Sequence, residues 1–436
     1  MAEKEYWGSR LGLILASIGY AVGMGNIWRF PYMVGQHGGG VFLVVYFLAV
    51  ILIAIPLFSI EVAMGKASGH APAGAYRALR PKGPWFLNGH IHVLVNLIAT
   101  GFTAPVAGWI IAYLVKTPSG LFSGMGAEEV EAYFGAFSNN SLEVMGWTTI
   151  LIVLIVLVLI RGLNRGLERM NKMMMPALLV LLLVLIIRGL TLEGAGQGVL
   201  FYLKPDFSKF TPQAVPAAVG QAFFSVGVAF GAAMVFGSYM RPKERVVSNA
   251  MIIGFSDMAV ATLAGFLVFP IVFAFGLQPE AGIGLIFITM PNIFNQMPFG
   301  EVFAVLFYLL FFLAAFSSFL GGTEAIAAHF RELWKLSRTR SLLITAGMVM
   351  TIAVLSSTST EVLARIDYLA INVFLIFGAF MMVVFVGWVW PIEGFLQTAG
   401  IRRRTARIFW TGLIKYFAPA AIIVIWLSQL NIIKTT

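Results

Sequence analysis

The chain contains 436 residues, of which 59% are hydrophobic and only 11% are charged. Because an average soluble domain carries about 25% charged residues, this composition excludes a cytosolic enzyme, and the high apolar content excludes a disordered chain. The chain contains no cysteine, which excludes disulfide bonds, thiolate metal sites and a cysteine nucleophile.

Eleven stretches are long and apolar enough to cross a bilayer as helices, which takes about 20 residues each. They lie at residues 11–36, 40–65, 88–114, 146–162, 172–190, 212–238, 246–276, 300–329, 341–357, 366–391 and 406–431. No hydrophilic segment between them is long enough to form a separate soluble domain. We therefore expect an all-α integral membrane protein with a single transmembrane domain over residues 1–436.

Basic residues are distributed unevenly between the two ends of these spans. Twenty-one of the 29 Lys and Arg residues precede the first span or follow an even-numbered span, and six lie in the opposite loops. Basic loops mark the cytoplasmic side of a membrane protein, so we expect a cytoplasmic N-terminus, an extracytoplasmic C-terminus and a multi-pass location in the cell inner (plasma) membrane. The net charge of +10 thus indicates topology and not binding to nucleic acid.

Two spans carry glycine-rich interruptions, GYAVGMGN at residues 19–26 and QAFFSVGVAFG at residues 221–231. Each glycine destabilises a helix by about 1 kcal/mol relative to alanine, and unwound backbone persists in a membrane only where protein or water satisfies it. Interrupted segments five spans apart are typical of inverted-repeat transporters that bind their substrate at the breaks. Close helix packing through GxxxG spacing is the alternative interpretation. Asn26 and Arg29 favour a functional break, because polar groups at that depth are costly without a role.

Broken helices suit the binding of an ion together with a small solute. The N-terminus of a half-helix exposes N–H groups that favour anions, and the freed carbonyls favour a cation. Oxygen atoms from carbonyl, amide, hydroxyl and carboxylate groups can hold a dehydrated Na⁺. The sequence therefore predicts an ion and substrate site near the middle of the membrane.

Three segments carry a specific resemblance to a known family. RLGLILASIGYAVGMGNIWRFPY, IRGLNRGLERMNKMMMPALL and GQAFFSVGVAFGAAMVFGSYMR resemble the neurotransmitter:sodium symporter family, whose bacterial members include amino-acid transporters. The resemblance covers essentially the whole chain. It implies a five-plus-five inverted repeat with helices 1 and 6 interrupted, in which spans 1–5 cover about 11–190, spans 6–10 about 212–391, and span 11 about 406–431.

The same resemblance implies a sodium-coupled symporter, not an enzyme, that imports a small amino acid, an amino-acid derivative or an amine by alternating access. Its expected partners are this small molecule, one or two sodium ions and the lipid bilayer. The first sodium site would use the Ala21 carbonyl and the side chains of Asn26, Ser225 and Asp257, the last replacing an Asn that is usual in the family.

The second sodium site would use three carbonyls and two adjacent hydroxyls. By resemblance these belong to Gly19, Val22, Ala314, Ser317 and Ser318. An alignment of the eighth span slipped by one residue would place Phe316 among the ligands, which Na⁺ cannot use. We therefore prefer the register that contains both serines.

The substrate pocket implied by the resemblance departs from the family pattern at two positions. Its residues are Tyr20, Ala21, Met24, Gly25, Ala99, Thr103, Phe224, Ser225, Gly227, Phe230, Ser318 and Gly322. Backbone N–H groups around Met24 and Gly25 match those that hold a substrate carboxylate. Thr103 replaces a tyrosine that contacts this carboxylate, and Tyr20 stands where some relatives have Asn. A missing phenol and an extra carboxylate suggest a substrate that is not an ordinary α-amino acid.

The resemblance also places two gates. Arg29 and Asp367 match the outer gate pair, which would close over the substrate. Lys4, Trp7 and Tyr239 match inner gate positions, and in the preferred register the acid that meets the basic residue is Glu332. Glu61 matches a carboxylate that braces the broken helices, whereas Glu324 receives no role.

Chloride dependence is not expected. Tyr46, Gln221 and Ser225 match three chloride-site positions, but Ala261 stands where chloride-dependent members carry Ser and independent members carry Glu. Asp257, one turn earlier, is a candidate for the missing negative charge. The five histidines show no ligand spacing, so sodium is the only metal expected.

Two alternatives keep the same fold. Coupling to protons through Asp257 is one, since a carboxylate in mid-membrane can carry a proton, and a non-transporting membrane sensor is the other. A channel would need a continuous polar path, which the apolar spans do not suggest. A membrane enzyme would need a catalytic constellation, and the sequence contains no P-loop, nucleophile elbow or HExxH motif. The sequence leaves the substrate and the oligomeric state open.

Overall fold

Helices make up all the regular structure of the computed structural model, which describes residues 5–276, 283–357 and 360–429. Among these residues, nine helices are long and apolar enough to cross a membrane. Four of them are single α-helices: α8 (Ser141–Leu159), α13 (Val246–Ala274), α15 (Gly300–Leu333) and α16 (Arg338–Ser356). Two are α-helices extended by a π-helical or 3-10 turn (η): α6 (Phe86–Lys116) with η3 (Thr117–Ser119), and α9 (Arg169–Leu190) with η4 (Leu163–Glu168) before it. Three are composite: α3 (Gly40–Ala49), η2 (Val50–Ala54) and α4 (Ile55–Ser68); α17 (Thr360–Asp367), η7 (Tyr368–Leu375), α18 (Ile376–Val384) and η8 (Phe385–Val389); and α20 (Arg404–Gly412), η9 (Leu413–Phe417) and α21 (Ala418–Gln429).

The first and sixth predicted spans are both broken, as the glycine patterns predicted. The first consists of α1 (Arg10–Ala21) and, after a break, η1 (Gly25–Arg29) with α2 (Phe30–Gln36), and its halves are bent by 51°. The sixth consists of α11 (Ala214–Val226) and α12 (Ala232–Ser238), each too short to span a bilayer alone. The bent first pair brings the described spans to ten. The eleventh, formed by the two short halves of the sixth, stays a prediction.

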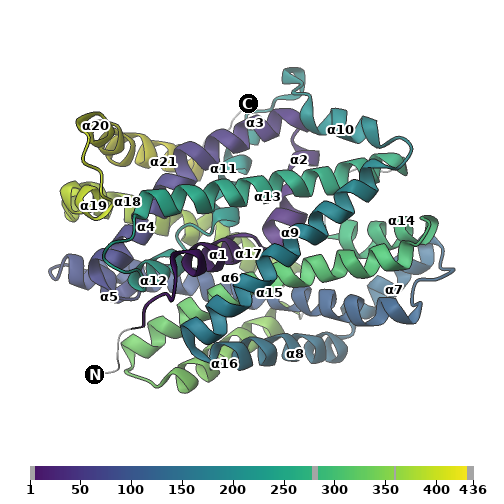
Figure 1. Cartoon of the computed structure of the whole chain (residues 1–436), viewed down its shortest axis with the longest axis horizontal. Coiled ribbons are helices and arrows are strands. Elements are labelled where there is room, and N and C mark those ends of the chain that lie inside the picture. The colour runs from purple at the N-terminus through teal and green to yellow at the C-terminus, as the bar shows by residue number, and fades with distance from the viewer. Residues whose placement is uncertain (1–4, 277–282, 358–359, 430–436) are drawn as a thin grey trace.

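Short helices occupy the connections between the spans. They are α5 (Pro72–Leu79), α7 (Ala127–Asn139), α10 (Ala195–Leu203), η5 (Phe207–Lys209), η6 (Leu285–Thr289) with α14 (Met290–Gln296), and α19 (Ile392–Thr398). Figure 1 shows α1 near the centre of the bundle, where it packs against α9, α13 and α15. We call the side on which residues 5–9 enter α1 the N-terminal face.

The first break is held open by polar side chains. Val22 leaves the helix in an extended conformation with φ −74° and ψ 92°. The Gly23 N–H then donates to Asn26 Oδ1 at 3.1 Å, and the Tyr20 carbonyl accepts a hydrogen bond from Ser318 Oγ at 2.9 Å. Backbone groups released by the break are thus satisfied within the protein, as hydrocarbon surroundings require.

The sixth break depends on three left-handed residues, Gly227, Ala229 and Gly231, with φ of +72°, +65° and +79°. Glu61 of α4 accepts the N–H groups of Ala229 at 2.9 Å and Gly231 at 2.7 Å. His92 of α6 contacts the Ala229 carbonyl through Nδ1 at 2.6 Å. Both side chains are fully buried, so Glu61 makes the bracing contact that the resemblance implies.

Close packing fixes α12 against α4. A Cβ atom at Gly65 would lie 1.8 Å from the Met234 carbonyl oxygen, and one at Gly237 would lie 2.2 Å from the Val62 carbonyl oxygen. Small residues let the backbones of neighbouring membrane helices approach each other in this way. The short second half of the broken sixth span is therefore anchored on the helix that carries Glu61.

A substitution at Gly231 tests the geometry of the sixth break. A Cβ in its left-handed conformation would lie 2.7 Å from Pro72 Cγ. Gly231→Ala is expected to destabilise the protein by on the order of 2 kcal/mol and to lower its melting temperature in detergent. The control is Gly347→Ala in α16, where nothing lies within 4 Å of the new Cβ and alanine favours the helix. Equal melting temperatures for the two variants would contradict this description of the break.

Candidate functional site

A cavity of about 80 Å³ lies where the two breaks face α6 and α15. Its lining residues are Tyr20, Ala21, Gly23, Met24, Gly25, Asn96, Ala99, Thr100, Thr103, Phe224, Gly227, Phe230, Ala315, Ser318, Phe319 and Gly322. Eleven of the twelve residues expected at the substrate pocket are in this set. The twelfth, Ser225, lies outside it in an adjoining polar cluster.

That polar cluster joins Asn26, Ser225 and Asp257, three of the residues expected at the first sodium site. Asn26 Nδ2 donates to Asp257 Oδ1 at 2.7 Å and to Ser225 Oγ at 2.9 Å. The Ser225 hydroxyl donates to Asp257 Oδ2 at 2.7 Å. Ala21, whose carbonyl is the fourth expected ligand, is the last residue of α1 and lines the cavity.

The charge of Asp257 is not balanced by a basic side chain among the described residues. Its side chain is completely buried, and both carboxylate oxygens accept hydrogen bonds from neutral donors. Burying a charge without a counter-charge is expensive. The cluster is therefore suited to a bound cation.

Residues expected at the second sodium site meet where α1 packs on α15. Ser317 Oγ donates to the Ala314 carbonyl at 3.0 Å, and Ser318 Oγ donates to the Tyr20 carbonyl at 2.9 Å. Gly19 belongs to the last turn of α1, and Val22 caps that helix. Phe316 instead stacks on Phe312, with ring centroids 5.3 Å apart, so the register that contains both serines presents the oxygen atoms.

Sequence reasoning missed Asn171, a buried residue of α9 beside this second cluster. Its amide nitrogen donates to the Leu167 carbonyl at 2.9 Å, while its Oδ1 has no hydrogen-bond partner. This oxygen lies 1.9 Å from the position that a Cβ at Gly19 would take. Asn171 directly precedes the fifth apolar segment at 172–190 and lies between Arg169 and Lys172, so its local sequence did not distinguish it from the polar loop. Asn96 and Thr100 of the cavity were also missed, although with Asn88 and His92 they form a polar stripe that repeats every four residues.

The expected outer gate pair is not joined by an ion pair in the described structure. The Arg29 guanidinium carbon lies 4.8 Å from the centre of the Phe224 ring, and Arg29 Nη1 is buried without a hydrogen-bond partner. Arg29 also lines a second cavity, of about 330 Å³, together with Tyr368 and Asn372. Asp367 is the last residue of α17 and directly precedes Tyr368, which lines this second cavity.

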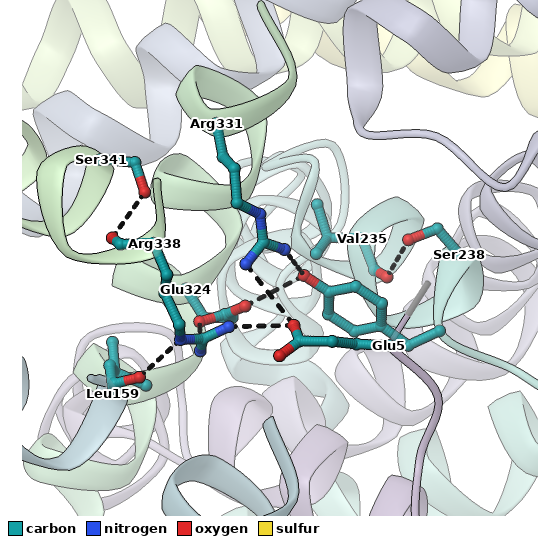
Figure 2. Close-up of polar contacts among 9 residues, drawn as sticks. Glu5, Leu159, Val235, Ser238, Glu324, Arg331, Arg338 and Ser341 are labelled. Carbon is teal, nitrogen blue, oxygen red and sulfur yellow. Dashed lines mark hydrogen bonds and ion pairs between the residues drawn. The ribbon is translucent and has the colours of Figure 1, made fainter. Parts of the chain in front are cut away.

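On the N-terminal face, Glu5, Glu324, Arg331 and Arg338 form a polar network (Figure 2), which Tyr239 joins through its hydroxyl. Tyr239 donates its hydroxyl hydrogen to Glu324 at 3.0 Å and accepts from Arg331 at 2.9 Å. Arg338 pairs with Glu324 at 2.5 Å and with Glu5 at 3.0 Å, and Arg331 lies 3.5 Å from the same Glu5 oxygen. These contacts hold together the N-terminal segment, the end of α12 and the α15–α16 pair, three regions distant in the sequence.

Trp7 packs beneath the network. Its side chain is fully buried, its indole N–H donates to the Phe236 carbonyl at 3.0 Å, and its ring contacts Tyr239 edge to face. Trp7 and Tyr239, two of the expected inner gate residues, therefore lie together. Lys4, the expected basic partner, lies outside the described residues.

Glu332, the acid expected to meet Lys4 at this gate, contacts neither Trp7 nor Tyr239 among the described residues, and its pairing with Lys4 stays a prediction. Seven residues, close to two helical turns, separate Glu324 from Arg331, so both project from the same side of α15. Glu332 is rotated by roughly 100° from that side and contacts the start of α5. There it accepts the Ala71 N–H at 2.7 Å and lies 3.0 Å from His70 Nδ1.

Comparison with known proteins decides the family. A sequence profile described as the sodium:neurotransmitter symporter family matches residues 4–122 and 135–436. The chain belongs to the sodium:neurotransmitter symporter family. This symporter chain is 32% identical to YhdH, an uncharacterized sodium-dependent transporter of Bacillus subtilis, over 453 aligned positions that cover all of both proteins.

A more distant relative of this symporter chain is the creatine transporter of Torpedo marmorata, 27% identical over 91% of this chain and 73% of the relative. Among solved structures, MhsT in complex with L-phenylalanine superposes with a TM-score of 0.91 and 33% identity, covering 98% of this chain and 100% of MhsT. The resemblance found in the sequence and the all-helical membrane fold are thereby confirmed.

The network on the N-terminal face can be tested by cysteine labelling, which has no background because the chain lacks cysteine. Arg331→Gln removes the hydrogen bond to Tyr239 and the ion pair to Glu5, worth about 1–2 kcal/mol together. When Cys is introduced at position 238 (Ser238→Cys), we expect maleimide to label this cysteine about 5- to 30-fold faster in the protein that also carries Arg331→Gln than in the protein that retains Arg331. Arg340→Gln, which removes an exposed arginine of the same face, is the control. Equal rates for the two variants would show that Arg331 does not keep this face closed.

Proposed function

We propose that this protein imports a small amino acid, an amino-acid derivative or an amine together with one or two sodium ions across the cell inner (plasma) membrane. Its family membership makes it a sodium-coupled symporter of small substrates. The observation that carries the finer proposal is the buried cluster of Asn26, Ser225 and Asp257 beside a cavity between two broken helices. Transport, and not catalysis or sensing, is the activity of this arrangement.

The first sodium ion binds at Asp257 in this proposal. A buried carboxylate whose hydrogen bonds come only from neutral groups lacks a counter-charge, and Na⁺ would supply that charge while the surrounding oxygen atoms coordinate it. Ala21, Asn26 and Ser225 complete the set. The second ion binds between Gly19, Val22, Ala314, Ser317 and Ser318. Because binding is reciprocal, an ion that favours the substrate-competent state is itself held more tightly by the substrate.

Substrate binds in the cavity with its carboxylate, where it has one, at the backbone N–H groups of Met24 and Gly25. MhsT, the structural relative, was crystallised with L-phenylalanine, which supports an amino acid. Phe224 and Phe230, whose rings meet edge to face, form the aromatic wall. The Thr103 hydroxyl donates to the Ala99 carbonyl at 2.6 Å. It therefore does not take over the contact with the substrate carboxylate that the family's tyrosine makes at this position.

Chloride is not required in this proposal, because hydrogen-bond donors at the candidate anion site are already in use. The Ser225 hydroxyl donates to Asp257 and the Gln221 amide to the Gly25 carbonyl. Tyr46 donates to Ser225 at 3.4 Å. The remaining Gln221 oxygen is a buried acceptor without a partner, and Ala261 supplies no polar group. An anion would meet oxygen atoms and the negative charge of Asp257.

The transport cycle alternates between the two gates. The N-terminal face is closed by the Glu5, Tyr239, Glu324, Arg331 and Arg338 network, whereas no ion pair joins Arg29 to Asp367 in the described structure. With the N-terminus in the cytoplasm, the protein here faces outward. Substrate and sodium then bring Arg29 and Asp367 together, after which the network opens toward the cytoplasm.

Asp257→Asn tests the first sodium site. Removing the buried charge is expected to raise the Na⁺ concentration for half-maximal thermal stabilisation at least tenfold, measured at constant ionic strength with K⁺ as the replacement ion. Asp206→Asn, which neutralises an exposed acid of a connecting loop, is the control and should behave as the unmodified protein. Unchanged Na⁺ dependence in Asp257→Asn would remove this residue from the site.

Proteoliposome uptake tests the function itself. Uptake of a stabilising amino acid or amine is expected under an inward Na⁺ gradient and not under a proton gradient alone, and replacing chloride by gluconate should leave the rate unchanged. Uptake driven by protons would support the alternative of proton coupling. Binding without uptake would support a sensor, and loss of uptake in gluconate would contradict the account of the anion site.

A further inference from the structure

Three polar side chains gather at one end of the cavity, around the α-carbon of Gly322. A Cβ at this glycine would lie 3.1 Å from Asn96 Oδ1, 3.2 Å from Thr100 Oγ1 and 3.9 Å from the ring of Tyr20. All three residues line the cavity. Because position 322 has no side chain, no Cβ of that residue stands against the two oxygen atoms.

This polar end is separated from the expected ion-binding and carboxylate-binding end. Ser318, which lies against Gly23 and the first break, is one helical turn before Gly322 on α15. One turn advances about 5.4 Å along the helix. A substrate whose carboxylate lies at Met24 and Gly25 therefore reaches the polar end with a side chain of a few atoms.

Tyr20 is held in place at this end by glycines on two helices. A Cβ at Gly227 would lie 2.4 Å from its ring, and a Cβ at Gly321 would lie 2.7 Å from its Cβ atom. Phe236 contacts the ring edge to face, with centroids 5.7 Å apart. The Tyr20 hydroxyl thus has a fixed position and, within the described chain, no hydrogen-bond partner.

The three side chains have hydrogen-bonding capacity to spare. Thr100 donates to Asn96 Oδ1 at 3.2 Å, and Asn96 Nδ2 makes a long contact of 3.4 Å to the Gly322 carbonyl. This leaves a second N–H of Asn96, the lone pairs of Thr100 and the hydroxyl of Tyr20. Asn96 is 3% exposed and Thr100 is 8% exposed. An apolar substrate group placed against them would remove these donors and acceptors from water without giving them a hydrogen-bond partner, which makes binding less favourable.

We infer that Asn96, Thr100 and Tyr20 select an amino acid whose short, neutral side chain carries a hydroxyl or a carboxamide group. This inference rests on the proposed function, because it assumes that the substrate's other end is held at the broken helices. No charged side chain is among the residues that line the cavity. The polar end therefore binds a neutral substrate group that can both donate and accept hydrogen bonds. Apolar side chains of the same shape are rejected.

The test compares amino acids of matched shape in the purified protein with Na⁺ present. Affinities for threonine and valine, and for asparagine and leucine, are measured by isothermal titration or by thermal shift. We expect each polar member to bind at least tenfold more tightly than its apolar partner, since a site built around hydrogen bonds discriminates strongly against an analogue that lacks them. Equal affinities, or tighter binding of valine and leucine, would overturn the inference.

Variants assign the preference to particular side chains. Asn96→Leu and Thr100→Val are expected to bring the ratio of threonine to valine affinity close to one. Thr149→Val is the matched control, because this exposed threonine of α8 bonds only its own helix, through the Met145 carbonyl. A preference that persists in both cavity variants would also overturn the inference.

The two proposals fail differently in this experiment. If none of these five amino acids and no amine or amino-acid derivative stabilises the protein in Na⁺, the proposed function fails. If phenylalanine, valine or leucine binds in a Na⁺-dependent manner while the polar partners bind no better, the function stands and the selective role of the polar end is refuted.

Discussion

The whole arrangement depends on how the protein satisfies backbone groups that leave their helices inside the membrane. In hydrocarbon an unpaired N–H or C=O costs several kcal/mol, so the breaks in the first and sixth spans exist only because side chains form hydrogen bonds with them. Glu61 and His92 hold the left-handed Ala229 from opposite sides, and Asn26 and Ser318 hold the first break. These side chains come from helices packed around the breaks, so the binding region and the packing of the bundle are inseparable.

The same low-polarity surroundings make the partner of each buried acid decide what that acid can do. The Asp257 carboxylate is surrounded by neutral donors, whereas Glu324, an acid buried almost as deeply, lies against Arg338. The first arrangement leaves a charge that a cation can complete. The second is complete within the protein and joins the N-terminal segment, α12, α15 and α16 on one face. Asp257 is thus suited to reversible binding of an ion, and Glu324 to a contact that keeps the N-terminal face closed.

Much of the candidate site follows from local patterns. Glycine runs predicted both breaks, because glycine weakens a helix whatever surrounds it, and the resemblance aligned residues of the cavity closely enough that eleven of the twelve line it. Asn96 and Thr100 were missed although, with Asn88 and His92, they recur every fourth residue and so share one face of the helix. Whether such a residue faces lipid, a neighbouring helix or a cavity depends on helix rotation, which is fixed by tertiary packing and not by the segment itself.

The sequence by itself determined the membrane class, the positions of the apolar helices, the two interruptions and, through its motifs, the family, since hydropathy and glycine content act locally. Only the tertiary structure decided which side chains meet across helices. It placed Arg331, and not the neighbouring Glu332, beside Tyr239, because a step of one residue turns a helix by roughly 100°. It also brought Tyr20, Asn96 and Thr100 together around Gly322, since residues so distant in the chain become neighbours only when three helices pack at one depth.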